Sequence, residues 1–223
     1  MAVNLDDVWK ADAVRAFLPA KKVSPSALRS AISSIPPDER DAWVDRVFGL
    51  DAYIADGPEL PRGCSPYLAC PVDAVIAAID EAAIDNADVF VDIGSGAGRV
   101  GLLVRLLTGA AVIGLEVQSA LVAASRRHAQ ELKLERFSVV LGDASQLVRY
   151  VPIGSVFFFY CPFGGPRLDR VIDDLEAIAK MRTLRLCGVN TRFPDRPWLG
   201  PVHRCREDLM VYRTLAHRTF QRT

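Results

Sequence analysis

The feature that most constrains the fold is an alternation of short apolar runs with longer amphipathic ones. The runs at 88–94, 111–117 and 184–190 are "DVFVDIG", "AVIGLEV" and "LRLCGVN", and they are apolar on both faces, as buried strands are. Amphipathic helix patterns lie between such runs, and one of them stops at Gly109. We therefore predict an α/β fold, a doubly wound and mostly parallel sheet with helices on both faces.

Other segments continue the alternation until the last one breaks it. Strands are expected at 137–143 and 155–160, helices at 72–83, 119–134 and 166–181, and a terminal antiparallel hairpin at 201–215.

The first part of the chain has a different pattern. It contains helical stripes such as Trp43, Val44, Val47 and Phe48, which must bury against something. Four prolines within 58–71 exclude a regular element there. We predict three parts: an N-terminal helical lid or partner surface at 1–57, a proline-rich connector at 58–71, and the main domain at 72–223.

Composition limits the function. Basic and acidic residues both number 27 in the 223-residue chain, so the net charge is zero and nothing draws the whole protein to nucleic acid or anionic lipid. The chain has no apolar run long enough for a membrane span or a signal peptide, so a cytoplasmic protein is expected. Its five cysteines form no C-x-x-C pair, and no metal site is expected.

The stretch "VDIGSGAGRVG" at 91–101 allows two interpretations. Counted from Gly96 it contains the G-x-G-x-x-G of a dinucleotide-binding turn, and counted from Asp92 it reads D-x-G-x-G-x-G. A carboxylate at Asp92 would repel a pyrophosphate but would attract the sulfonium and ammonium of S-adenosylmethionine. Glycines at 94, 96 and 98 would let that ligand approach the backbone.

Two further acids follow the next two predicted strands. Glu116 ends the second strand, where a carboxylate can accept both ribose hydroxyls of an adenosine. Asp143 ends the third and is followed by Ala144, so it can accept the adenine amino group beside a small side chain. The alternative for Asp143 is a helix N-cap.

The fourth strand ends in "YCPFGGP". Tyr160 and Phe163 lie where the transferred methyl group would point, and aromatic faces there could stabilise it. In the connector, Tyr67 is expected to cover the methionine end of the cofactor, with the N-terminal helices forming a roof over the acceptor.

In this order, the motifs resemble those of the class I S-adenosylmethionine-dependent methyltransferases, over about residues 64–215. The resemblance implies a seven-strand sheet and assigns the cofactor. It implies that the methionine part lies along Asp92, Gly94, Ser95, Gly96 and Gly98, the ribose at Glu116 beside Val117, the adenine at Asp143 and Ala144, and the acceptor near Tyr160 and Phe163. The stretch 89–118 looks most like the seven-strand histone-lysine methyltransferases.

One motif departs from the amine-directed members of that class. They carry Asn or Asp, then Pro-Pro and an aromatic residue, where this chain has Tyr160 and Cys161 before Pro162. N-methylation and O-methylation therefore both stay open, and the acceptor is a small molecule or a protein side chain rather than nucleic acid. A non-catalytic cofactor- or nucleoside-binding module and an NAD-dependent oxidoreductase are the alternatives.

Overall fold

The computed structural model describes residues 10–50, 54–58, 60–200, 203–204 and 206–215. The first nine residues of the predicted lid lie outside the described residues, and so do residues 201, 202 and 205 of the predicted hairpin.

A single mixed sheet forms the centre of the molecule, with the strand order β3-β2-β1-β4-β5-β7-β6. The first five strands along the chain pair in parallel, and β7 runs antiparallel to β5 and β6. Their bounds are β1 Val89–Ile93, β2 Ala111–Glu116, β3 Phe137–Leu141, β4 Val156–Tyr160, β5 Arg185–Val189, β6 His203–Arg204 and β7 Leu209–Arg213.

The predicted α/β class, the mostly parallel sheet and the antiparallel hairpin are confirmed. The seven-strand prediction holds only in part among the described residues, because six strands have five or six residues and β6 has two. β6 pairs with β7 through His203 and Arg204 alone, so the sheet has six full strands and a short seventh segment.

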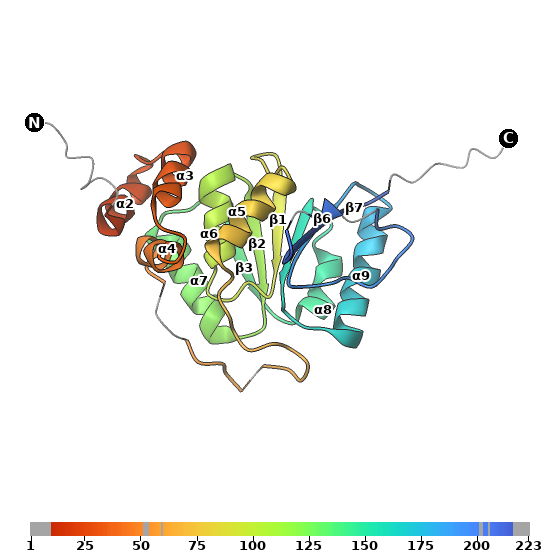
Figure 1. The fold of residues 1–223 in the computed structure, drawn as a ribbon. Helices are drawn as coiled ribbons and strands as arrows, with labels where there is room; N and C mark the ends of the chain where they lie inside the picture. Colours follow the sequence, from red (N-terminus) through yellow and green to blue (C-terminus); the bar gives the residue numbers. More distant parts are fainter. Residues whose placement is uncertain (1–9, 51–53, 59, 201–202, 205, 216–223) are drawn as a thin grey trace, which may run out of the picture.

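Helices cover both faces of the sheet (Figure 1). One face carries α5, α6 and α7, and the other carries α8 and α9. Their bounds are α5 Val72–Glu81, α6 Arg99–Thr108, α7 Ser119–Glu131, α8 Ala144–Leu147 and α9 Gly165–Ala179. Helix α6 ends at Gly109 as predicted, because this glycine adopts a φ of 77° that closes the helix.

The central strands are buried on both sides, as their sequences predicted. On β4, Phe158 faces the layer of α5 and α6, whereas Phe157 and Phe159 face α9. Phe90 and Phe158 are fully buried, and their ring centroids lie 5.7 Å apart. The two large clusters of buried side chains therefore hold the layers together, one on each face of the sheet.

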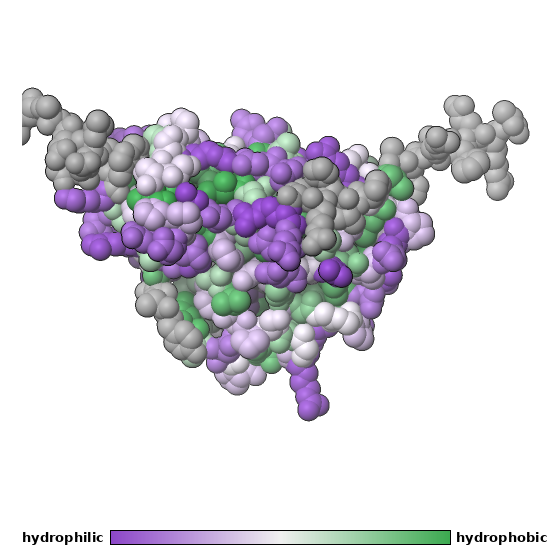
Figure 2. Space-filling view, in the orientation of Figure 1, coloured by the Kyte–Doolittle hydropathy of each residue, from purple (hydrophilic) through white to green (hydrophobic). Residues whose placement is uncertain are grey.

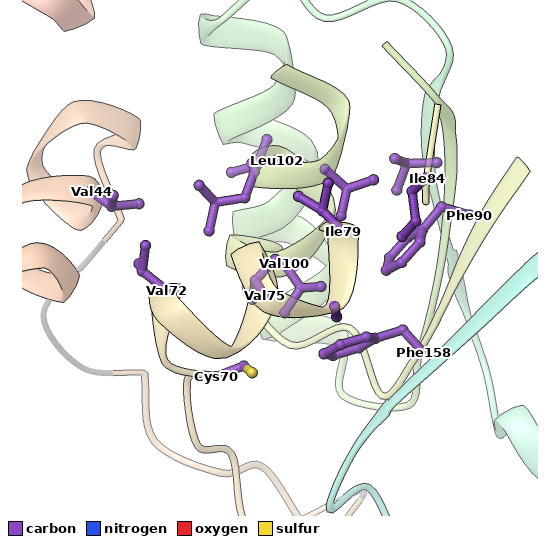
Figure 3. Close-up of a cluster of buried hydrophobic side chains, with 14 of the residues drawn as sticks. Val44, Cys70, Val72, Val75, Ile79, Ile84, Phe90, Val100, Leu102 and Phe158 are labelled. Carbon is purple, nitrogen blue, oxygen red and sulfur yellow. The ribbon is translucent and has the colours of Figure 1, made fainter. Parts of the chain in front are cut away.

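The N-terminal helices extend the first of these clusters. They are α2 Ala11–Phe17, the short 3-10 turn Leu18–Ala20, α3 Pro25–Ser34 and α4 Arg40–Phe48. Helices α3 and α4 contact α6, and α4 also contacts α5. Figure 3 shows Val44 of α4 facing Val72 at the start of α5. These helices thus form an outer layer beside the sheet.

The surface in Figure 2 is mostly hydrophilic over the N-terminal helices, and apolar side chains appear there in small separate groups. Within the part of the chain that the structure describes, no helix combines the length and the apolar character needed to cross a bilayer.

The strand order changes direction at β1. The chain passes from β1 to β2 and β3 on one side, and then returns to place β4 on the other side of β1. Loops after β1 and β4 therefore diverge, and a crevice opens at the carboxyl ends of the strands. The glycine-rich loop at 94–98 lies at this point.

Candidate functional site

A cavity of about 450 Å³ opens at this edge of the sheet. Its walls come from the connector, the loop after β1, the ends of β2, β3 and β4, and the start of α7. It is lined by Leu60, Cys64, Ser65, Pro66, Tyr67, Leu68, Gly94, Leu115, Glu116, Val117, Gln118, Leu121, Gly142, Asp143, Ala144, Tyr160, Cys161, Pro162 and Phe163. The volume lies in the range of small-molecule sites, about 300–1,000 Å³.

Most of the residues predicted from the sequence meet in this cavity. Those in its walls are Tyr67, Gly94, Glu116, Val117, Asp143, Ala144, Tyr160 and Phe163. Asp92, Ser95, Gly96 and Gly98 are not in the walls. They lie behind them, since Asp92 and Ser95 are buried, the ring of Tyr67 covers Gly96, and Gly98 faces Ser125.

The amides of the glycine-rich loop are already used within the protein. The N–H groups of Gly94 and Ser95 donate to the carbonyl of Leu115, at 2.9 and 3.1 Å, and the N–H of Gly96 donates to Glu116 Oε2 at 2.8 Å. A pyrophosphate site needs such amides to point at the anion. The geometry therefore gives a second reason, besides Asp92, against dinucleotide binding.

Tyr67 and Gly96 determine how close the connector lies to the loop. Gly96 has a φ of 53°, and a Cβ atom built on it would overlap the ring of Tyr67. Glycine is therefore required at 96 both for the backbone conformation and for this contact. The backbone N–H of Tyr67 donates to Asp56 Oδ1 at 2.9 Å, which holds the connector in place.

Asp92 is the least compensated acid at the site. Asp92 is 2% exposed, and its Oδ2 atom is buried with no hydrogen-bond partner. Burial and the neighbouring charge of Glu116 raise the pKa of Asp92 to about 8. A buried carboxylate without a partner is costly, and a cation placed near it would lower that cost.

Glu116 connects the end of β2 to the glycine-rich loop. Its Oε2 accepts from Gly96, and its Oε1 accepts from the backbone N–H of Gln118 at 2.8 Å. Burial raises the pKa of Glu116, and these backbone hydrogen bonds oppose the rise. Each carboxylate oxygen keeps further lone pairs, so a pair of hydroxyls can still bind here.

Asp143 makes a different set of contacts. Its Oδ1 accepts from the N–H and the hydroxyl of Ser145, at 2.9 and 2.7 Å, so it is the N-cap of α8. Its Oδ2 forms an ion pair with Arg167, near the start of α9. Burial acts to raise the pKa of Asp143, but Ser145 and Arg167 outweigh it and the net shift is downward.

The loop after β4 forms one wall of the cavity, with Tyr160, Cys161, Pro162 and Phe163. Cys161 has a φ of 45°, an uncommon value for a residue other than glycine, and its N–H donates to Thr191 Oγ1 at 2.9 Å. Phe163 pairs with Cys64 of the connector in an isolated bridge. Burial raises the pKa of Tyr160, so its phenol stays protonated near neutral pH and is not a ready base.

The roof predicted from the N-terminal helices is not found over this cavity. None of the described residues before Leu60 lines it, because α3 and α4 pack against α6, α4 also packs against α5, and α2 packs on α4. Asp56 and Gly57 of this segment are hydrogen-bonded to Gln118, which lines the cavity. Gln118 bonds to both, from its Nε2 to Asp56 Oδ1 at 2.8 Å and through its Oε1 to the N–H of Gly57 at 2.6 Å.

Sequence reasoning missed three polar residues near the site. Gln118 lines the cavity, Arg167 contacts Asp143, and Arg99 lies at the start of α6 directly after the glycine-rich loop. Gln118 could have been suspected because it follows Glu116 by two residues. Nothing local marks Arg99 or Arg167, whose partners are remote in the sequence.

Comparison with known proteins gives one match to a family model. Residues 84–159 match a methyltransferase domain, a segment that contains β1 to β3, the glycine-rich loop and all of β4 except its last residue, Tyr160. No protein in a curated collection matches the sequence significantly.

Solved structures share the fold at low sequence identity. The putative methyltransferase yhhF from Escherichia coli is 20% identical, with a TM-score of 0.52, over 70% of this chain and 90% of its own. The putative methylase HI0767 from Haemophilus influenzae is 15% identical, with a TM-score of 0.50, over 64% and 98%. MtNAS, solved in complex with MTA and tNA, is 13% identical, with a TM-score of 0.52, over 92% and 75%.

The three solved structures match different shares of this chain. A match over 92% of this chain must include most of the N-terminal helices, whereas matches over 64% and 70% need not. The fold of MtNAS is therefore similar to this chain beyond the sheet and its covering helices. Residues 84–159 therefore resemble a methyltransferase domain, and the chain shares its fold with the putative methyltransferase yhhF and the putative methylase HI0767.

Proposed function

We propose that the protein transfers a methyl group from S-adenosylmethionine to a nucleophile that enters beside Tyr160 and Phe163. The observation that carries the proposal is the meeting of Glu116, Asp143 and the loop after β4 around one cavity, with the unpartnered Asp92 behind the glycine-rich loop. A cationic cofactor fits this set, because its positive charge compensates Asp92, whose Oδ2 is buried without a hydrogen-bond partner. S-adenosylmethionine supplies an electrophilic methyl group on a sulfonium.

Different residues of the cavity bind different parts of the cofactor. Glu116 accepts the ribose hydroxyls while it holds Gly96, and Asp143 with Ala144 receives the adenine. Tyr67 covers the loop at the methionine end. Tyr160 and Phe163 exclude water at the transfer edge, where alignment of the acceptor with the methyl group does most of the work.

We favour an acceptor that can attack the methyl group without first losing a proton to a base of the enzyme. Glu116 already accepts two backbone N–H groups, Asp143 is paired with Arg167, and Tyr160 stays protonated. A lysine ammonium would need a base to remove its proton before attack. We therefore favour a small molecule with a neutral ring nitrogen or an ionised oxygen over the lysine side chain that the histone-lysine likeness of 89–118 suggests.

The test is transfer of label from S-adenosylmethionine carrying a radioactive methyl group, incubated with the protein and a cell extract. The extract is separated into protein and small-molecule fractions, and the cofactor product is identified by chromatography. Label in small molecules with formation of S-adenosylhomocysteine is expected. Label in protein lysines would support the histone-lysine alternative instead.

Two results would overturn methyl transfer itself. Binding of S-adenosylhomocysteine with no turnover in any extract would favour the non-catalytic module. Formation of 5′-methylthioadenosine would mean that the amino acid part of the cofactor, rather than its methyl group, is transferred. A variant at an exposed ion pair away from the cavity, Asp12→Asn, is the matched control and keeps full turnover.

A further inference from the structure

One contact between the N-terminal helices and the main domain involves a buried charge, the guanidinium of Arg99. This residue is the first of α6 and directly follows Gly98, which is the N-cap of that helix. Its side chain is 8% exposed, although arginine is seldom buried without partners. Whatever holds Arg99 therefore also holds the end of the glycine-rich loop.

The hydrogen-bond partners of the Arg99 side chain that the structure describes lie on α4 and in the connector. Nε donates to Asp45 Oδ1 at 2.8 Å, and Nη2 donates to Asp45 Oδ2, so Asp45 of α4 binds the guanidinium through both oxygens. Nη1 donates to Asp41 Oδ2 at 3.2 Å and to the carbonyl of Cys70 at 3.1 Å. Bidentate pairs of this kind fix both distance and orientation.

The same contacts reach the connector. Cys70 lies three residues after Tyr67, whose ring covers Gly96. Asp41 also accepts the N–H of Val72 at 2.8 Å, at the start of α5. Helix α4 therefore supports the end of the glycine-rich loop through Arg99. It also steadies the connector, whose Tyr67 covers the other side of that loop.

We propose that α4 is a brace for the glycine-rich loop and that Arg99 is a positioning residue for the cofactor. This inference rests on the proposed function, and it replaces the predicted roof with a support behind the site. The brace acts through the ion pair of Arg99 with Asp45. Loss of that pair leaves the helices folded on the apolar cluster around Val44 but lets the loop move.

The experiment compares the full-length wild type with Asp45→Asn. Asp45 is preferred to Asp41, because Asp41 also holds Val72. Asp12→Asn is the matched control, since it breaks the exposed pair of Arg46 on α4 with Asp12 on α2, away from the loop. Each protein is titrated with S-adenosylhomocysteine by calorimetry, and unfolding in urea is measured in parallel.

Asp45→Asn is expected to weaken binding of S-adenosylhomocysteine at least about fivefold, in the range of coupling between sites. Asp12→Asn leaves the Kd unchanged. Amide hydrogen exchange locates the change: exchange at 96–102 becomes faster in Asp45→Asn only, whereas a general loss of stability would also speed exchange in the buried strands. Arg99→Lys keeps the charge but loses the bidentate geometry, and it is expected to fall between the wild type and Asp45→Asn.

The outcomes separate the two proposals. If the wild type does not bind S-adenosylhomocysteine, the proposed function fails. If the wild type binds but Asp45→Asn binds equally well with unchanged exchange at the loop, the brace is overturned while the function stands. A loss of affinity that matches in Asp45→Asn and Asp12→Asn would also overturn it, because the effect would come from the helices as a whole.

Discussion

Glu116 and Asp143 occupy equivalent places, at the ends of the neighbouring strands β2 and β3, yet their surroundings differ. Glu116 accepts hydrogen bonds from backbone amides of the glycine-rich loop and of the start of α7. It is also buried, and burial raises its pKa. Asp143 is bonded to side chains of Ser145 and Arg167, and its pKa is lowered. The same type of residue thus supports the loop in one place and anchors a helix in the other.

The difference shows that a strand-end acid can serve the fold and a ligand together. Glu116 keeps the backbone of the loop in place, so its loss should damage the site itself. Asp143 mainly joins α8 to α9, and its loss should be more local. Substitutions that separate these roles test the comparison.

The largest effect is expected for Glu116→Ala. The buried N–H groups of Gly96 and Gln118 lose their acceptor, and each costs about 1–3 kcal/mol when left unsatisfied. Binding of S-adenosylmethionine and of S-adenosylhomocysteine should weaken together, because the two share the ribose. Parallel calorimetric titrations measure this, and Glu116→Gln should lose less because it keeps one oxygen. A loss confined to one ligand would separate Glu116 from the ribose.

Asp92→Asn is expected to come next, since Asp92 is the acid that lacks a partner at Oδ2. Binding of S-adenosylmethionine should weaken by about 1–3 kcal/mol, as for loss of a contact with a charged group. Calorimetry on the folded variant measures the change. Unchanged affinity would mean that the positive charge of the cofactor does not act on Asp92.

The same substitution should change the pH dependence of stability without ligand. The folded protein keeps a proton on Asp92 up to about pH 8, whereas the unfolded chain loses it near 3.8. This contribution to stability is therefore complete below about pH 4 and is lost as pH rises towards 8. Urea unfolding from pH 5 to 9 should show a steeper decline for the wild type than for Asp92→Asn, and equal slopes would contradict the raised pKa.

Arg167→Met tests the other side of the comparison, with a smaller expected effect of about 1 kcal/mol on cofactor affinity. Asp143 stays in place through Ser145 but loses the partner that helps keep its pKa low. The stability gained from ionised Asp143 is present above pH 3.8 and lost as pH falls through the folded pKa, so the loss should begin at higher pH in the variant. Unfolding between pH 3 and 7 measures it, and superimposable curves would leave Arg167 without this role.

The smallest effect on cofactor binding is expected for Tyr160→Phe, within about 0.5 kcal/mol for S-adenosylhomocysteine. Its phenol stays protonated, so we expect turnover to fall less than a hundredfold, since loss of an acid–base group costs about 10²–10⁴-fold. Single-turnover rates with the identified acceptor decide the point. A larger fall would mean that the Tyr160 hydroxyl takes part in the transfer step.

Local pattern was enough for the sheet and for the positions of the strand-end residues. The runs at 88–94 and 111–117 contain β1 and β2, and the stop at Gly109 ends α6, because apolar periodicity and a left-handed glycine act within a few residues. Parallel strands bring their carboxyl ends to one edge, so Glu116, Asp143 and Tyr160 were predicted to meet before any contact was known. The order of these residues along the chain carried that information.

The contacts behind the site depended on the tertiary structure alone. Arg99 and Asp45 are 54 residues apart, and Arg167 and Asp143 are 24 apart, so no local period relates them. The N-terminal helices were predicted from their apolar stripes, but a stripe says only that a face is buried and does not say against what. Packing against α5 and α6 determined that α4 lies behind the glycine-rich loop rather than over the cavity, because the apolar surface available to those helices is there.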